Sequence, residues 1–192
     1  MGHREDLLAG AVRCLYEKGY GRTTARDIVA ASGTNLGSIG YHYGSTEALL
    51  NAALNQAVEN WGTELAAAIM ATPAEGLTGL ARFEAYWVKV LDTIAEHRPV
   101  LMATFDAFVQ MDHVPEIKQM LTEGMRDARV LWAAVFHQVD AAVEAEKAYQ
   151  LGSFYQALLS GVLAQWLIDP EHAPSGHDLA EALRMIATDA TA

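Results

Sequence analysis

The stretch that decides the fold is Thr23–Leu50, TTARDIVAASGTNLGSIGYHYGSTEALL. Thr24 and Asp27, three residues apart, form the pattern of a capping box and predict a short helix that ends near Gly33. Asn35 is a favourable N-cap for a second short helix of about eight residues. The stretch therefore predicts two short capped helices joined through a glycine.

The two short helices are predicted to cross as a helix-turn-helix. Gly33 can take the positive φ that a sharp turn between helices needs. Ile28 and Val29 on the first helix and Ile39 on the second supply the apolar groups that would fix the crossing. In such a unit the second helix enters a major groove while the first crosses the DNA backbone. The stretch therefore predicts a DNA-binding unit.

The rest of the chain is also predicted to be helical, so the expected fold class is all-α. The apolar residues from Leu7 to Tyr16 follow the spacing of an amphipathic helix that Gly19 ends, and Ser45 caps a long helix over roughly 46–71. No run alternates apolar and polar residues over the length of a strand. Further helices are expected at about 75–97, 100–111, 115–142, 145–168 and 176–190.

Two domains are expected, 1–46 and 47–192, with the helix over 46–71 connecting them. The 192 residues carry a net charge of −11, but five basic against four acidic residues give the first 46 a charge of +1, which leaves −12 on the rest. An acidic surface repels a phosphate backbone. The N-terminal domain is therefore the part that a polyanion can approach at low cost.

Residues 148–168 carry no formal charge over about one bilayer span. Polar residues recur at every third to fifth position, which favours a helix covered by protein on both sides over a membrane span. The first ten residues, MGHREDLLAG, lack the apolar region of a signal peptide. A cytoplasmic protein without a membrane partner is expected.

In their order and spacing, the N-terminal motifs resemble the N-terminal domain of the TetR family of bacterial transcriptional regulators. The resemblance covers about a quarter of the chain, and the remainder is similar only in length and helix count. It implies a three-helix DNA-binding domain followed by a larger helical domain for ligand binding and dimerisation. The motifs that carry it are Tyr16–Tyr20, Thr23-Thr24, Arg26–Ile28, Ala31–Gly33, Gly44-Ser45 and Glu47–Leu50.

The resemblance also implies which residues contact DNA, at the start of one helix, on the recognition helix after it, and at the start of the next. These residues are Thr24, Arg26, Asn35, Leu36, Ser38, Tyr41, His42 and Thr46. Two positions depart from the family, which usually has an aromatic residue in place of Gly40 and Lys in place of Thr46. Tyr41 is expected to take the role of the missing aromatic residue. The loss of one cation is expected to reduce the salt dependence of binding by about one unit.

Residues 76–168 are rich in aromatic and methionine side chains, which suit either a core or the lining of a small-molecule cavity. The resemblance implies a cavity for a hydrophobic effector. The candidate lining residues are Phe83, Trp87, Met102, Phe105, Phe108, Met120, Trp132, Phe136 and Tyr155. The polar candidates to orient a ligand are Asp106, Gln110, His137 and Gln156.

The helices at about 145–168 and 176–190 are expected to form a homodimer interface, because the uncharged helix needs a second cover. The resemblance implies a four-helix bundle from two chains. A twofold dimer would present two recognition helices to a pseudo-palindromic site on double-stranded DNA, about one helical turn apart.

No enzymatic activity, metal site or cofactor is expected. His137 and Asp140 lie one helical turn apart, but no second such pair accompanies them, and no phosphate-binding glycine loop is present. Cys14, on an apolar helix face, is expected in the core. The expected function is a ligand-responsive transcriptional regulator, a repressor released by a hydrophobic small molecule. The alternative, motivated by Gly40 and Thr46, is a small-molecule-binding or scaffolding helical dimer with a weakened DNA-binding domain.

Overall fold

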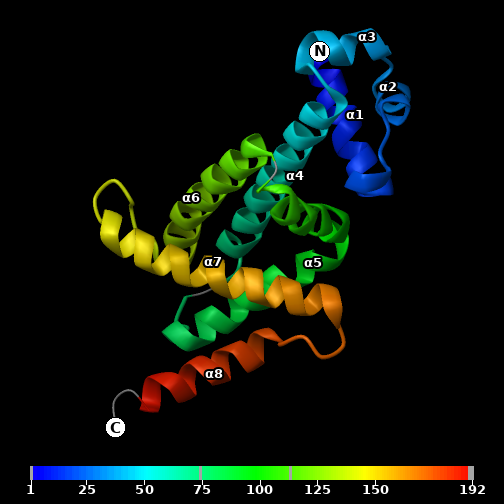
Figure 1. Ribbon diagram of the computed structural model, residues 1–192. Helices are drawn as coiled ribbons and strands as arrows, with labels where there is room; N and C mark the ends of the chain where they lie inside the picture. The colour runs from blue at the N-terminus through cyan, green and yellow to red at the C-terminus, as the bar shows by residue number, and fades with distance from the viewer. Residues whose placement is uncertain (1, 74, 113, 190–192) are drawn as a thin grey trace. The chain divides into compact units, whose positions relative to one another are not determined.

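The computed structural model describes residues 2–73, 75–112 and 114–189, and the chain is helical throughout (Figure 1). Within these residues there are eight α-helices, the short 3-10 helix η1 and no strand, which confirms the all-α prediction. In chain order the elements are α1 (His3–Lys18), η1 (Tyr20–Arg22), α2 (Ala25–Ser32), α3 (Leu36–Tyr43), α4 (Thr46–Met70), α5 (Gly79–Gln110), α6 (Pro115–His137), α7 (Ala145–Ile168) and α8 (Gly176–Asp189).

One predicted break between helices is wrong. The helices expected at 75–97 and 100–111 are a single helix, α5, with Pro99 inside it. A proline inside a helix removes one backbone hydrogen bond but leaves the following residues free to stay helical. Val100 and Leu101 are buried directly after it, so burial of this segment outweighs the local preference for a break.

The helix predicted over 115–142 ends earlier, at His137. Gln138 takes a positive φ of 56°, and its N–H donates to the Ala134 carbonyl at 2.8 Å. The turn brings Val139 into a small core with Ala133 and Ala148. This apolar contact after a helix end is typical of a C-cap and explains why the helix does not continue. The predicted end of the last helix, residue 190, lies outside the described residues.

The chain divides into two compact units. Unit 1 comprises Met1–Trp61 and Glu96–Gly124, and unit 2 comprises Gly62–Ala95 and Met125–Ala192. Helices α4, α5 and α6 each contribute residues to both units. The helix-turn-helix thus shares a compact unit with parts of three later helices, whereas the functional boundary at residues 46 and 47 stays a prediction.

The core of unit 1 joins the three N-terminal helices to the first half of α4. Its buried side chains are Leu7, Ala11, Cys14, Leu15, Ile28, Ile39, Leu49, Leu50, Ala53, Leu54 and Ala57, with Val100, Ala103, Ala107 and Ile117 from α5 and α6. The helices approach closely at Gly10, where a Cβ would lie 2.8 Å from the Cβ of Ser32. The position of α2 on α1 therefore depends on the absence of a side chain at Gly10.

In unit 2, α7 buries one face and exposes the other. The buried face follows helical spacing and consists of Ala148, Gly152, Tyr155, Leu159, Val162 and Leu163. Tyr149 and Ile168 are exposed on α7. Among the described residues α7 alone is long and apolar enough to cross a membrane, a test that the core helix of a soluble protein also passes. The bounds of α7 are those predicted. Its exposed face carries apolar side chains.

The crossing of α6 and α7 gives a prediction for stability. A Cβ at Gly152 would lie 2.1 Å from the Arg129 carbonyl oxygen, closer than any real contact. We expect Gly152→Ala to reduce the free energy of unfolding by about 1–3 kcal/mol, because the helices must separate. Denaturant titration measures this change.

The matched control is Gly124→Ala, because Gly124 is exposed on α6 and a Cβ there would meet no atom within 4 Å. This control should be as stable as the original chain or more stable by up to about 1 kcal/mol. Equal stability of the Gly152 variant and the control would contradict the close crossing.

Candidate nucleic-acid interface

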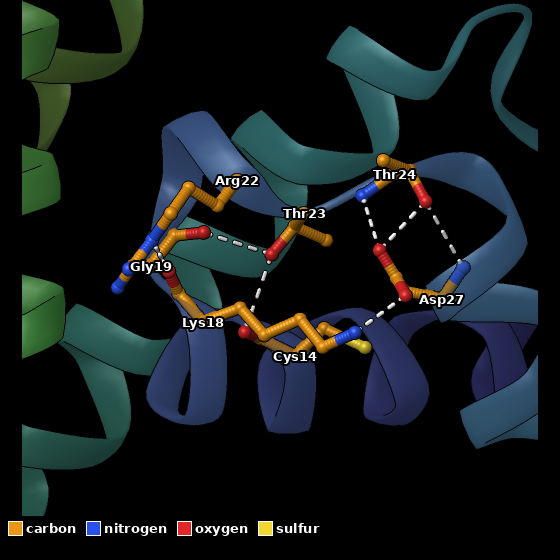
Figure 2. A network of polar contacts seen from close by, with 7 residues as sticks. All are labelled: Cys14, Lys18, Gly19, Arg22, Thr23, Thr24 and Asp27. Carbon is orange, nitrogen blue, oxygen red and sulfur yellow. Dashed lines mark hydrogen bonds and ion pairs between the residues drawn. The ribbon is translucent and has the colours of Figure 1, made fainter.

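The start of α2 is fixed by the predicted capping box (Figure 2). The hydroxyl of Thr24 accepts a hydrogen bond from the backbone N–H of Asp27 at 3.3 Å and donates to the Asp27 carboxylate at 2.6 Å. The same carboxylate accepts the backbone N–H of Thr24 at 2.9 Å. The predicted cap is confirmed, and it places Thr24 at the exposed N-terminus of α2.

Asp27 also joins α2 to the end of α1, a contact that the sequence does not predict. The ammonium of Lys18 lies 2.5 Å from the Asp27 carboxylate (Figure 2). The hydrogen bond from Lys18, followed by those from Thr24, holds the pKa of the Asp27 carboxyl well below its usual range. The same hydrogen bond raises the pKa of Lys18. No local spacing rule indicates this pair, because the two residues are nine positions apart on different helices.

The end of α1 is closed by the residues between the two helices. The hydroxyl of Thr23 donates to the carbonyl oxygens of Gly19 at 2.8 Å and Cys14 at 3.2 Å. The guanidinium of Arg22 donates to the Lys18 carbonyl at 2.9 Å. Figure 2 shows these bonds beside the Thr24–Asp27 cap. The connection is therefore held by its own side chains and supports the start of α2.

The turn and α3 follow the predicted pattern. Gly33 has φ 67°, which allows the sharp turn after α2. The Asn35 side-chain oxygen accepts the Ser38 N–H at 3.1 Å, which confirms the predicted N-cap. Ile39 and Ile28 lie in the same core, and only 4% of Ile39 is exposed. The buried side of α3 is therefore fixed, and its opposite side faces outward.

All eight residues predicted to contact DNA lie in unit 1. Tyr41 is 85% exposed and Leu36 is 53% exposed. The Tyr41 ring lies edge-on to the His42 ring, with 4.8 Å between their centroids. Thr24, Arg26 and Asn35 are exposed, whereas Ser38, His42 and Thr46 are half-buried. The contacts with DNA themselves stay a prediction.

The basic side chains of this region differ in their partners. Arg26 is exposed and makes no ion pair within the described part of the chain. Arg4 lies over the Tyr43 ring, 5.5 Å from its centroid, and the Tyr43 hydroxyl donates to the Arg4 carbonyl at 2.9 Å. This anchor of α3 on α1 was not predicted. Arg26 is thus the cation on α2 that is available to a phosphate.

A second group of candidate residues lies in unit 2. Five of the predicted ligand-binding residues gather there as an aromatic cluster: Phe83, Trp87, Trp132, Phe136 and Tyr155. Tyr86, not among the predicted residues, lies edge-on to Phe136 at 5.5 Å between centroids. Met102, Phe105, Phe108 and Met120 lie in unit 1 instead. The structure therefore brings together five of the nine.

The aromatic cluster contains a few polar groups. The Tyr155 hydroxyl lies 2.8 Å from Nε2 of His137, and Trp132 donates to the Gln156 side chain at 3.1 Å. Burial raises the pKa of Tyr155 to about 12 and, with the nearby charges of Arg82 and Lys147, lowers that of His137. The indole N–H of Trp87 is buried and has no acceptor among the described residues. The cluster thus combines aromatic surface with one unused hydrogen-bond donor.

The remaining polar candidates lie elsewhere. Asp106 is exposed in unit 1, and the side chain of Gln110 lies outside what the structure describes. Cys14 is buried in the core, as predicted, and burial raises the pKa of its thiol. A protonated, buried thiol is a poor nucleophile.

Comparison with known proteins agrees with this arrangement. Residues 7–53 match a family described as "Bacterial regulatory proteins, tetR family". The chain is 18% identical to the multidrug binding protein EbrR complexed with proflavin, over 96% of this chain and 99% of that one, with a TM-score of 0.66. No curated protein matches the chain.

Two further crystal structures have similar folds. A tetR-family transcriptional regulator from Streptomyces coelicolor is 18% identical over 94% of this chain and 78% of that one, with a TM-score of 0.63. A transcriptional regulator from Rhodococcus sp. Rha1 is 15% identical over 97% of this chain and 96% of that one, also with a TM-score of 0.63. At these identities the likeness shows the fold.

The position of Asp27 predicts how stability depends on pH. Because the pKa of this carboxyl is lower in the folded chain, its contribution to stability is present above the unfolded value and is lost as the pH falls through the acid range. We expect Asp27→Asn to lower the unfolding temperature near pH 7. This difference should shrink as the pH falls below about 4, because Asp27 takes up a proton in the unfolded chain there while the folded chain still holds it charged. Thermal unfolding followed by circular dichroism across this range measures it.

The control is Thr24→Ser, which keeps the hydroxyl of the cap and should unfold like the original chain at both pH values. A difference for Asp27→Asn that is as large at pH 3 as at pH 7 would contradict a role for the Asp27 charge.

Proposed function

We propose that this chain is a homodimeric, cytoplasmic transcriptional repressor, because residues 7–53 match the tetR family of bacterial regulatory proteins. It binds a pseudo-palindromic operator on double-stranded DNA and is released by a hydrophobic small molecule. The observation that carries the proposal is the outward face of α3, with Tyr41 protruding while Ile39 fixes the opposite side in the core. In this proposal residues 1–46 bind DNA and residues 47–192 bind ligand and dimerise.

The DNA-binding part of the proposal is supported by the geometry of α2 and α3. In a helix-turn-helix the residues at the start of the first helix meet the backbone, and those of the second helix meet base edges. Thr24 and Arg26 stand at the exposed start of α2, where the first-turn backbone N–H groups that the capping box does not use favour an anion. Leu36, Ser38 and Tyr41 stand on α3 and are assigned to the bases.

The dimer is supported by uncovered apolar surface. Ala157 and Gly161 are exposed on α7, and Met185 and Ile186 are exposed on α8. Small residues at helical spacing let a second helix approach closely, and a twofold interface uses the same surface on both chains. Two copies of α7 and α8 would cover each other and set the spacing of the two α3 helices.

The aromatic cluster is proposed as the effector site. EbrR, which has a similar fold, has been crystallised with proflavin, a planar aromatic molecule. To release the dimer from DNA, the effector must bind the state that cannot bind DNA more tightly than the state that can. An effector with equal affinity for both states does not shift the equilibrium between them. The cluster of Phe83, Trp87, Phe136 and Tyr155 offers aromatic faces for such a molecule.

The proposal is tested by selection from a random duplex pool at low and moderate salt, with the bound DNA sequenced. We expect enrichment of a pseudo-palindrome with half-sites about one helical turn apart. Absence of enrichment, with a chain shown to be a folded dimer, would overturn DNA-binding regulation. That result would favour a small-molecule-binding or scaffolding dimer. The absence of a side chain at Gly40 and of a cation at Thr46 supports this alternative.

Arg26 gives a quantitative test of the phosphate contacts. We expect Arg26→Ala to weaken operator binding and to reduce the slope of log affinity against log salt by about one unit per chain. Fluorescence anisotropy over a salt series measures both quantities. The matched control is Lys89→Ala, because Lys89 lies in unit 2 and is paired with Asp92 on α5. An unchanged slope for the Arg26 variant would remove Arg26 from the phosphate contacts.

Trp87 gives a test of the effector site, with proflavin as the probe. We expect proflavin to quench the tryptophan fluorescence in a saturable way, and Trp87→Phe to weaken its binding at least about fivefold. This substitution keeps an aromatic ring but removes the buried N–H. Operator affinity should stay within about twofold, because Trp87 lies outside unit 1. If the variant binds proflavin as the original chain does, Trp87 does not belong to the site.

A further inference from the structure

The outward face of α3 carries few side chains. At roughly 100° per residue, Gly37, Gly40 and Gly44 fall on one side of the helix, between Leu36 at one edge and Tyr41 at the other. All five residues are exposed, in agreement with this geometry. We call the three glycines the glycine strip. One aliphatic and one aromatic side chain flank it.

Gly40 has no reason within the chain to lack a side chain. Gly44 has φ 80°, which favours glycine, whereas Gly40 is not among the described residues with positive φ. A Cβ at Gly40 would meet no atom within 4 Å. A glycine inside a helix is less favourable than alanine there. In a working DNA-binding helix, a glycine at this position allows close approach of the backbone to an external surface.

The flanking residues indicate which chemistry that surface has. Helix α3, LGSIGYHY, contains no Lys, Arg, Asn, Gln, Asp or Glu. The side chains that pair with guanine or adenine through two hydrogen bonds are therefore absent from it. Asn35, just before the helix, already uses its oxygen for the Ser38 N–H. Leu36 and Tyr41 protrude instead, and an apolar group in the major groove contacts the 5-methyl group of thymine.

Building on the proposed function, we propose that α3 recognises its half-site chiefly through thymine methyl groups. Leu36 and Tyr41 pack on these methyl groups, and the glycine strip lets the helix backbone approach the base edges between them. Leu36 and Tyr41 are then the specificity-determining residues, and Gly40 sets the distance of approach. The preferred half-site carries A·T pairs beneath α3, where a cationic recognition helix would select guanine.

The first test removes single methyl groups from the DNA. In the operator obtained by selection, each thymine is replaced in turn by uracil, which pairs identically but lacks the 5-methyl group. We expect one or two positions in each half-site to lose about fourfold in affinity, the value of one buried methyl group. Thymines outside the half-sites should be insensitive. Anisotropy at fixed salt measures the affinities.

Variants of the chain then assign these positions. In Leu36→Ala, the uracil effect should fall below about twofold at one sensitive position and persist at the other. Tyr41→Phe should keep both effects, because the ring remains, whereas Tyr41→Ala should remove the second. Val143→Ala is the matched control, because Val143 is an exposed apolar residue in unit 2.

A second test addresses the distance of approach. We expect Gly40→Ala to unfold at the same or a higher temperature than the original chain, since the added methyl group meets no atom of the chain. Its operator affinity should nevertheless fall at least about tenfold, because the methyl group would stand between backbone and bases. Gly124→Ala, with equally open space around its Cβ, should bind the operator as the original chain does.

The outcomes separate this inference from the proposed function. Enrichment of a pseudo-palindrome with no uracil-sensitive position would overturn thymine recognition and leave the regulator in place. Unchanged operator affinity in Gly40→Ala would overturn the close approach alone. No enrichment with a folded dimer would overturn the proposed function, and thymine recognition with it.

Discussion

The Asp27 carboxylate is the interaction on which the geometry of the N-terminal unit depends. It accepts hydrogen bonds from the backbone and hydroxyl of Thr24 and pairs with Lys18, so it caps α2 and joins α2 to the end of α1. The Thr24 hydroxyl completes this cap, because it accepts the backbone N–H of Asp27. Because α3 follows α2 after the short turn at Gly33, this anchor adds to the contacts that orient α3. A single carboxylate thus connects a local capping pattern to the packing of α2 on α1.

The second constraint is the division of α3 into a fixed and an open side. Ile39 lies in the core, and the Tyr43 hydroxyl is bonded to the Arg4 carbonyl on α1. These contacts hold the helix from behind and at its end. Because contacts of the buried face hold α3 in place, its exposed face can carry the glycine strip, which has no side chains. The stability that a glycine-containing helix lacks is supplied by tertiary contacts rather than by helix propensity.

Local patterns predicted the N-terminal unit well and the later helices less well. The caps at Thr24, Asn35 and Ser45 need only residues three positions away, and the structure has all three. The continuation of α5 through Pro99 depends on burial that no local pattern shows. For the same reason the Lys18–Asp27 pair and the Arg4–Tyr43 anchor were not predicted. The ligand candidates share only their residue type, and residue type does not predict which compact unit a side chain lies in.

In the proposed regulator, α5 is the element that links the effector site with the DNA-binding unit, because it contributes residues to both compact units. It supplies Phe83 and Trp87 to the aromatic cluster of unit 2, and it supplies His97 to unit 1. There Nδ1 of His97 lies 2.8 Å from the hydroxyl of Tyr16 on α1, the helix that also carries Lys18. Coupling needs an element whose position both sites influence. In the proposed regulator, a ligand that displaces α5 would act on the helix that is hydrogen-bonded to α1, and α1 in turn holds α2 through the Asp27 carboxylate.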